Sequence, residues 1–173
     1  KTIINFHDLI HEKRSDLISF KQKILRKVIF YNSARYASKI VASSRAMKQD
    51  FLENFKFLKS NDIIVISEGV DLKLFKIKKK DKEIIKKYKL PKKFIFFPAQ
   101  LWKHKNHIFV LKQFKNDSFL RNSDYEIILT GGKKNFHKEI FEFIEVNKLS
   151  KVRYLGKLKT SEYIKIFNLC DIL

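Results

Sequence analysis

Cysteine is almost absent from the 173-residue sequence, which contains only Cys170. A single thiol excludes a disulfide framework and metal clusters of the cysteine type, and it fits a reducing cytosolic setting. The sequence also lacks any apolar run close to the roughly 18 residues that a membrane-spanning helix requires, and no signal peptide is visible in it. We therefore expect a cytoplasmic location, which still allows contact with the inner face of the cell membrane.

Arginine is scarce in a strongly basic sequence. Lys and Arg number 38 against 18 Asp and Glu, which gives a formal net charge of +20, yet only six of the cations are arginine. A charge of this size usually indicates nucleic acid or an anionic membrane as a partner. Recognition of phosphates and bases favours the bidentate arginine, however, and the lysines are scattered through every segment. The composition therefore favours a general lysine bias and argues against nucleic acid binding.

Segments typical of strands alternate with segments of helical periodicity along the sequence. Strands are expected at residues 2–6, 39–42, 62–66, 94–97, 125–130 and 152–155, and helices at 19–36, 44–55, 81–88, 107–115, 136–144 and 160–167. This alternation predicts an α/β fold with parallel sheets in the doubly wound style. The lysine-rich stretch at 76–82 has the composition of a linker. We therefore expect two partial Rossmann-like domains, 1–75 and 76–173, joined by a hinge in an internal fragment of a longer chain.

The stretch from Phe94 to His107 combines a strand, a basic loop and the start of a helix. Pro98 cannot donate to a sheet, so the strand should end there, and Asn106 is a good N-cap for the following helix. Open α/β sheets bind ligands in loops at the carboxyl ends of strands. This loop gathers side chains that suit an anion such as phosphate beside a helix N-terminus, namely Lys103, His104, Lys105 and His107. A solvated basic loop in a lysine-rich protein is the alternative.

Several segments, taken in order, carry the pattern of a known family. They are Ser-Glu-Gly-Val-Asp-Leu running to Phe at residues 67–75, Tyr-Lys-Leu-Pro at 88–91, Pro-Ala-Gln-Leu-Trp-Lys-His-Lys-Asn at 98–106, and Val-Arg-Tyr-Leu-Gly running to Cys-Asp at 152–171. Together they cover most of residues 38–173 and resemble the retaining glycosyltransferase family 4. The resemblance implies the GT-B fold, in which two Rossmann-like domains face each other across a cleft. It also implies retaining, metal-independent hexosyl transfer from a nucleotide sugar.

The same resemblance assigns roles to individual side chains. Lys105 matches the basic position that contacts the donor diphosphate, where an ammonium group stabilises the departing phosphate. Gln100 stands where many members have arginine, and it can donate a hydrogen bond but carries no charge. His7 matches the first-domain histidine that faces the donor sugar, with a strand-end histidine in a polar niche as the alternative.

Two glycine loops complete the expected donor site. Gly131 and Gly132 follow a predicted strand, and they either let the backbone approach the nucleotide closely or simply form a turn. Gly156, Lys157 and Leu158 match the loop near the nucleotide base, where backbone groups make the contacts. The family's pair of acidic residues is expected downstream of the sequence, so we expect the isolated 173 residues to be inactive in sugar transfer.

The expected substrates are a nucleotide sugar, with GDP-mannose favoured by a loop typical of bacterial surface polysaccharide synthesis, and a saccharide or lipid-linked acceptor. No cofactor and no metal are expected. Two other functions stay open: a GT-B nucleotide-sugar epimerase, and a non-catalytic basic module that binds nucleic acid. The basic segment at 20–35 either packs its apolar stripe against a sheet or rests on an anionic membrane; the stripe consists of Phe20, Ile24, Leu25, Val28 and Ile29.

Overall fold

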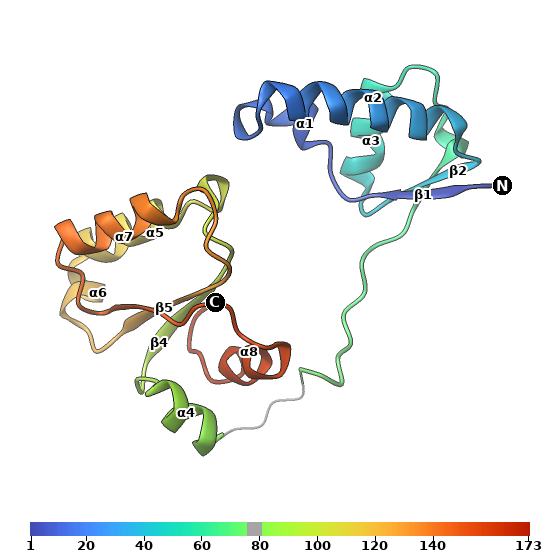
Figure 1. Cartoon of the computed structure of the whole chain (residues 1–173). Helices are drawn as coiled ribbons and strands as arrows, with labels where there is room; N and C mark the ends of the chain where they lie inside the picture. The colour runs from blue at the N-terminus through green and yellow to red at the C-terminus, as the bar shows by residue number, and fades with distance from the viewer. Residues whose placement is uncertain (76–80) are drawn as a thin grey trace. The chain divides into compact units, whose positions relative to one another are not determined.

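The computed structural model describes residues 1–75 and 81–173, apart from the side chains at positions 10, 11 and 15, and it shows two compact units (Figure 1). The first unit comprises Lys1–Val70 and the second comprises Asp71–Leu173. The sequence predicts a domain boundary after residue 75, and most of the predicted linker, residues 76–80, lies outside the described residues. Each unit is an α/β structure with its own parallel sheet, as predicted.

The first unit contains a three-stranded sheet covered by helices. Its strands β1 (Ile3–Phe6), β2 (Lys39–Ala42) and β3 (Ile63–Val65) are parallel and pair in the order β1-β2-β3. Its helices are α1 (Ile10–Lys13), α2 (Phe20–Tyr36) and α3 (Arg45–Asn54), with short 3₁₀ turns η1 (Ser15–Leu17) and η2 (Ser60–Asp62). Ser19 caps α2 and Ser44 caps α3, because each hydroxyl accepts a hydrogen bond from a backbone N–H of the first turn. The elements predicted in this part of the sequence are confirmed.

One face of the first sheet carries the core of its unit. Phe6, Ile40 and Ile63 lie on that face and form a buried cluster with Ala34 of α2 and Phe51 of α3. Successive side chains of a strand point to opposite faces, so the neighbours of these residues point the other way. On that second face, hydrophobic side chains of the outer strands stay exposed, including Ile3 and Ile64.

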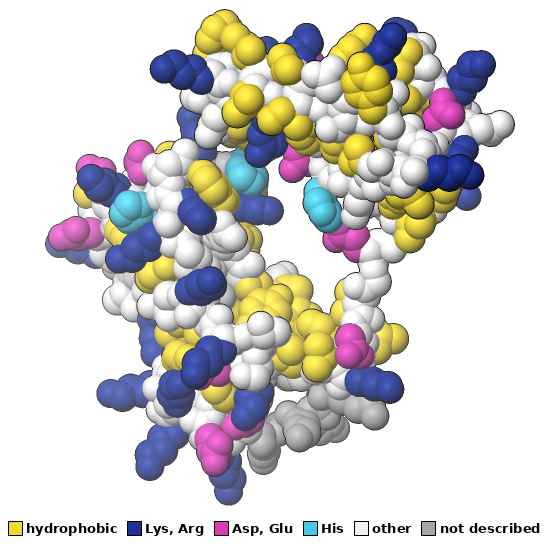
Figure 2. Space-filling view, turned by 45° about the vertical axis from the view of Figure 1, so that its right-hand side comes forward, with side chains coloured by type: hydrophobic (Ala, Val, Ile, Leu, Met, Phe, Trp, Pro, Cys, Tyr) yellow, Lys and Arg dark blue, Asp and Glu magenta, His cyan; other side chains and the backbone are white. Residues whose placement is uncertain are grey.

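Helix α2 does not pack with the face that the sequence indicates. Its predicted stripe is exposed to solvent and consists of Phe20, Ile24, Leu25, Val28 and Ile29. The helix instead turns Phe30 and Ala34 toward the core, because the small Ala34 allows a close approach and the ring of Phe30 stacks on Phe6 with 4.6 Å between centroids. The expectation that the stripe packs on this sheet is therefore wrong. Figure 2 shows hydrophobic side chains among lysines and arginines on the surface of the unit that contains α2.

The second unit is built on another parallel sheet, with strands β4 (Phe94–Pro98), β5 (Glu126–Thr130) and β6 (Val152–Tyr154) in the order β4-β5-β6. Ile172 adds a parallel bridge to Ile95 on the free side of β4. The chain thus runs outward from β4 to β6 and then returns to the opposite side of β4. This reversal is the topological switch point of a doubly wound sheet, where ligands bind at the carboxyl ends of the strands.

Helices cover both faces of this second sheet (Figure 1). They are α4 (Lys82–Tyr88), α5 (His107–Asn116), α6 (Ser118–Asn122), α7 (His137–Val146) and α8 (Thr160–Phe167), with a 3₁₀ turn η3 (Lys103–Lys105). Ile128 points into a core with Ile84 of α4 and Ile166 of α8, whereas its neighbour Ile127 points into a core with Leu111 of α5 and Ile140 of α7. Burial on both faces explains why the strands of this unit are continuous apolar runs.

Candidate functional site

The loops that follow β4, β5 and β6 meet at one edge of the second sheet. They enclose a cavity of about 240 Å³ at the carboxyl ends of the strands. Its lining residues come from all three loops and the start of α8, and they are Pro98, Ala99, Gln100, Thr130, Gly131, Gly132, Lys157, Leu158, Thr160 and Tyr163. Five residues predicted for the donor site, Gln100, Gly131, Gly132, Lys157 and Leu158, are therefore brought together in one place.

Hydrogen bonds tie the three loops to one another. The hydroxyl of Thr130 and the N–H of Gly131 both donate to the carbonyl of Gly156, at 2.5 and 2.9 Å. The hydroxyl of Tyr154 donates to the carbonyl of Gly131 at 2.6 Å, and the N–H of Leu101 donates to that of Gly132 at 3.1 Å. The backbone of the site is thus held in one arrangement before any ligand binds, which lowers the entropic cost of binding.

Gly131 lies where no other residue fits. Its φ angle is +140°, a backbone conformation that L side chains rarely adopt. A Cβ atom at this position would lie 2.7 Å from the carbonyl carbon of Ala99 and 2.9 Å from the Cα atom of Gln100. The close approach of the loops after β4 and β5 therefore depends on glycine at position 131.

The loops around the cavity carry positive charge without acidic residues. Segments 99–106, 131–136 and 155–159 contain no Asp or Glu and six lysines, namely Lys103, Lys105, Lys133, Lys134, Lys157 and Lys159. None of these lysines forms an ion pair within residues 1–75 and 81–173. Because uncompensated charges of one sign at a concave surface raise the local concentration of the opposite ion, this edge of the sheet suits an anionic ligand.

Gln100 is positioned by its neighbour in the same loop. Its side-chain oxygen accepts a hydrogen bond of 2.9 Å from the indole N–H of Trp102, so the amide N–H₂ group is left to donate. The ammonium group of Lys134 lies over the ring of Trp102, 5.4 Å from its centroid. Trp102 thus connects the loop after β4 with the loop after β5.

Lys105 lies in η3, between the end of β4 and the start of α5, and its side chain is exposed. It belongs to the loop at the carboxyl end of β4 but does not line the 240 Å³ cavity. The helix start also differs from the prediction, because Asn106 has φ +56° and its side chain makes no capping hydrogen bond. The turn η3 ends at this residue in the left-handed conformation, so Asn106 serves as the exit from η3 and not as a side-chain cap.

His107 is not part of the basic loop surface, so its place in the predicted anion site is wrong. Its side chain is fully buried and packs on Phe97, with 4.7 Å between ring centroids. Neither ring nitrogen has a hydrogen-bond partner in the described part of the chain. Burial lowers the pKa of His107 from 6.5, and the charge of Lys105 acts in the same direction. The carbonyl of Ala99 partly opposes this shift without meeting the geometry of a hydrogen bond.

The lowered pKa of His107 predicts an acid-sensitive second unit. The unfolded chain binds the proton more readily, so the stability that neutral His107 contributes is complete above about pH 6.5 and is lost as the pH falls toward the lower folded pKa. The loss is at most about 1.4 kcal/mol per pH unit. We expect His107→Phe to remove this part of the slope when the free energy of unfolding is measured in urea at several pH values. Identical slopes in the two proteins would contradict the assignment.

His7 lies in the first unit, just after β1, and pairs with a residue that follows β3. Its Nδ1 atom is 3.1 Å from Oε1 of Glu68, and both side chains are largely exposed. The pair joins the carboxyl ends of two strands of the first sheet and leaves Nε2 of the imidazole facing away from Glu68. His7 is therefore a solvent-accessible histidine with an oriented ring, and it does not fill a buried polar niche.

The sequence pattern does not indicate several other residues of the site. Thr130, Tyr154, Thr160 and Tyr163 line the cavity or fix its loops. Thr130 is the last residue of a predicted strand, and a polar residue at that position of an otherwise apolar strand was the one available signal. The role of Tyr154 depends on the distance between two loops, which the sequence alone does not contain.

Cys170, the only cysteine of the sequence, does not line the cavity. Cys170 is half-buried, its Sγ atom donates to the carbonyl of Phe167 at 3.1 Å, and burial raises the pKa of the thiol. Within the described ranges, no group of three or more His, Cys, Asp or Glu is arranged to hold a metal ion. In the same ranges, no helix combines the length and the apolarity needed to cross a bilayer.

Comparison with known proteins identifies the fold. No protein-family model and no curated protein sequence matches this chain. A structure of Anabaena Alr3699/HepE in complex with UDP and glucose matches 98% of this chain and 44% of that protein, with a TM-score of 0.73 and 18% identity. A glycosyltransferase from Rickettsia africae ESF-5 matches 98% of this chain and 43% of that protein, with a TM-score of 0.71 and 23% identity.

A third similar structure is the UDP-N-acetylglucosamine 2-epimerase from Rickettsia bellii, with a TM-score of 0.55 and 15% identity over 89% of this chain and 41% of that protein. The chain thus spans less than half the length of each of these proteins. The likenesses confirm the predicted fold class, in which the two units are partial Rossmann-like parallel-sheet domains of the GT-B type.

Proposed function

We propose that this chain is part of a retaining, metal-independent glycosyltransferase that moves a hexose from a nucleotide sugar to a saccharide or lipid-linked acceptor. The observation that carries the proposal is the glycine-walled cavity at the carboxyl edge of the second sheet, whose three loops carry six lysines and no Asp or Glu. A nucleoside diphosphate combines the negative charge and the hydrogen-bond acceptors that such a cavity suits. The similarity of the 98–106 and 152–171 segments to glycosyltransferase family 4 supports the same function.

The proposed roles follow the chemistry of each residue. The backbone of Gly131 and Gly132 approaches the nucleotide, and the loop of Gly156, Lys157 and Leu158 receives the base. Gln100 donates a hydrogen bond to the diphosphate, and the flexible ammonium group of Lys105 stabilises the departing phosphate. His7 is the eighth residue with a proposed role. Its imidazole, oriented by Glu68, faces the donor sugar.

Two donors are candidates, a uridine diphosphate sugar and GDP-mannose. UDP and UDP-glucose are bound in the structures of Alr3699/HepE, which favours a uridine diphosphate sugar. The Pro-Ala-Gln and His-Lys-Asn-His elements of the 98–107 loop resemble enzymes of surface polysaccharide synthesis and favour GDP-mannose. We propose a cytoplasmic enzyme of bacterial surface polysaccharide synthesis in either case.

Isothermal titration calorimetry of the 173-residue chain tests the proposal. UDP-glucose or GDP-mannose should bind saturably, and the matching nucleoside, which lacks the diphosphate, should bind at least about tenfold more weakly because it forgoes the charge-assisted hydrogen bonds. Equal affinity for nucleoside and nucleotide sugar would contradict the proposed diphosphate site. A steep fall in affinity with salt but no preference among nucleotide sugars would instead favour the basic nucleic-acid-binding module.

A nucleotide-sugar epimerase is the second candidate, because the Rickettsia bellii 2-epimerase shares the fold. The Gly-Val-Asp segment at 69–71 and the Lys-Asn pair at 105–106 favour the transferase. Incubation of the chain with UDP-N-acetylglucosamine, followed by chromatography of the sugars, tests for epimerase activity. Appearance of the epimeric sugar without an acceptor would establish the epimerase.

The exposed stripe of α2 also supports contact with the surface of an anionic membrane. The helix has no acidic residue, and it carries five cations, Lys21, Lys23, Arg26, Lys27 and Arg35, along with its exposed apolar side chains. A helix with these two features binds at the interface of anionic lipids through apolar burial and charge attraction. Such contact would bring the enzyme to a lipid-linked acceptor at the inner face of the membrane.

Vesicle flotation measures this contact. We expect the chain to float with vesicles that contain phosphatidylglycerol but not with purely zwitterionic vesicles. Leu25→Gln combined with Val28→Gln should reduce the floated fraction at least about fivefold, because each apolar side chain contributes on the order of 1.5 kcal/mol when it enters the interface. Both side chains are exposed, so the double variant should fold normally. Absence of the wild-type chain from the floated fraction would end the membrane proposal.

A further inference from the structure

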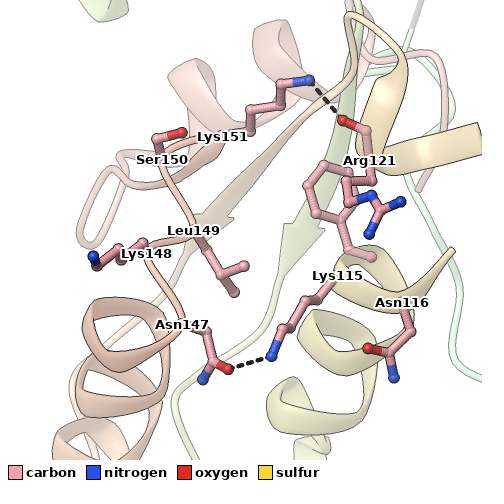
Figure 3. Close-up of a pocket in the computed structure, with 9 residues that line it drawn as sticks. Lys115, Asn116, Arg121, Asn147, Lys148, Leu149, Ser150 and Lys151 are labelled. Carbon is pink, nitrogen blue, oxygen red and sulfur yellow. Dashed lines mark hydrogen bonds between the residues drawn. The ribbon is translucent and has the colours of Figure 1, made fainter. Parts of the chain in front are cut away.

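A second and larger cavity lies at the opposite edge of the second sheet. It has a volume of about 580 Å³, which is in the range of small-molecule sites. Its walls come from the last turn of α5, from α6, and from the loop that leads from the end of α7 into β6, as Figure 3 shows. The loops of the proposed donor site follow the carboxyl ends of the strands, whereas this cavity lies next to the residues that precede β5 and β6.

The lining of this cavity is basic and contains no carboxylate. It includes four cations, Lys115, Arg121, Lys148 and Lys151, and the remaining lining residues are neutral. None of the four forms an ion pair in the part of the chain that the structure describes. The nearby Asp117 uses its carboxylate to cap α6, where it accepts the N–H of Leu120 at 2.8 Å. The four cations of the cavity are therefore not neutralised by direct ion pairs within the described residues.

Two of the cations are held in place by neutral oxygen atoms. Lys115 reaches from α5 and donates to Oδ1 of Asn147 at 2.7 Å, and Lys151 donates to the carbonyls of Arg121 and Ser123 at 3.0 and 2.7 Å (Figure 3). These bonds fix the two ammonium groups without cancelling their charge, so they give the cavity a permanent positive potential. The side chains of Arg121 and Lys148 are exposed. In Figure 3 the ammonium group of Lys148 points away from Arg121, and its flexible stem allows it to turn toward a ligand.

An apolar surface completes the cavity. Phe114 is buried beneath it and Leu149 is half-buried in its wall. Asn116 and Ser150 add uncharged hydrogen-bonding groups at the rim. A site with an apolar wall and a guanidinium group at its opening matches a small molecule that has a ring-sized apolar body and one phosphate group, because arginine binds phosphate oxygens in a bidentate manner.

We propose that this cavity is a binding site for a small phosphate monoester, separate from the donor site, with Arg121 and Lys148 as its phosphate-binding side chains. The lysines Lys115 and Lys151 supply fixed charge, and the wall at Leu149 accepts the apolar body of the ligand. The proposal depends on the geometry of this cavity alone, so it stands whether or not the chain binds a nucleotide sugar.

The test is a titration of the ¹⁵N-labelled chain with phenyl phosphate, inorganic phosphate and phenol, followed by NMR. Phenyl phosphate should saturate shifts of the backbone amides of Asn116 and Ser150, with a dissociation constant at least about tenfold below that for inorganic phosphate or for phenol. Arg121→Gln combined with Lys148→Gln should weaken phenyl phosphate binding about tenfold or more, because two charge-assisted hydrogen bonds are lost.

The matched control is Lys112→Gln combined with Lys138→Gln. These lysines lie exposed on α5 and α7 and do not line the cavity, so the double variant removes the same charge from the same unit. Binding to the control should change less than about twofold. Equal losses in the two double variants, shifts confined to Gly131 and Gly132, or equal affinity for inorganic and phenyl phosphate would each overturn the proposal.

Discussion

Gly131→Ala should destabilise the second unit by about 3 kcal/mol or more and abolish nucleotide-sugar binding. The backbone at this position has φ +140°, which costs alanine strain, and the new methyl group would lie 2.7 Å from the carbonyl carbon of Ala99. Relief of this overlap requires the loops after β4 and β5 to move apart. The movement would break the hydrogen bond between Leu101 and Gly132 and would open the cavity.

Gly132→Ala is the matched control for this change. The nearest atom to a Cβ at Gly132 is the flexible end of Lys134, at 3.7 Å, and the φ of Gly132 lies outside the strained range. We expect a change in the free energy of unfolding of less than about 1 kcal/mol and retained ligand binding. Urea unfolding and calorimetry on the two variants measure both quantities. A Gly131→Ala protein as stable as the Gly132→Ala protein would show that the two loops do not need their close approach.

Lys105→Ala should weaken binding of UDP-glucose or GDP-mannose about tenfold or more and leave binding of the bare nucleoside within about twofold. The physical reason is that an ammonium–phosphate hydrogen bond contributes about 1.5–3 kcal/mol, which corresponds to roughly a tenfold to hundredfold change in affinity. Lys105 does not line the cavity itself, so the prediction requires its exposed side chain to reach the diphosphate from η3.

Lys86→Ala is a control of equal charge, because Lys86 is exposed on α4 and lies outside the donor cavity. Calorimetric titration of both variants at the same ionic strength separates a local contact from the general attraction of a basic protein. If the two variants lose the same small amount of affinity, Lys105 is one of many surface lysines and the role implied by the family resemblance does not apply to it.

The order and type of the main elements could be predicted because the second sheet is buried on both faces. Runs such as Phe94 to Phe97 and the strand up to Thr130 are then continuously apolar, and Asp81 marks the start of α4 as a cap. The convergence of Gln100, Gly131 and Lys157 also follows from the alternation of strands and helices, since the carboxyl ends of parallel strands share one edge.

The orientation of individual side chains could not be predicted in the same way. Helix α2 is apolar on more than one side, so its sequence does not reveal that Phe30 and Ala34 face the core. His107 is buried because the first position of α5 faces Phe97, and Asn106 loses its capping role because η3 precedes the helix. Each of these outcomes depends on the distance between elements, which the hydrophobic pattern leaves undetermined.

Glu68 illustrates the same limit in the first unit. In the sequence it is only one residue of the Ser-Glu-Gly-Val-Asp-Leu segment that begins at residue 67. In the structure its carboxylate lies 3.1 Å from His7, because β1 and β3 end on the same edge of their sheet. A pair separated by 61 positions in the chain becomes visible only when the strand order is known.

In the proposed function, the nucleoside diphosphate of the donor binds at the carboxyl edge of the second sheet. The most direct test is an NMR titration of the ¹⁵N-labelled chain with UDP-glucose and with GDP-mannose, in which the shift of each backbone amide is followed. We expect saturable shifts for at least one of the two nucleotide sugars, largest at Gly131, Gly132 and Lys157. Shifts that never saturate, or that concentrate at Arg121 and Lys148 on the opposite edge, would contradict this proposal.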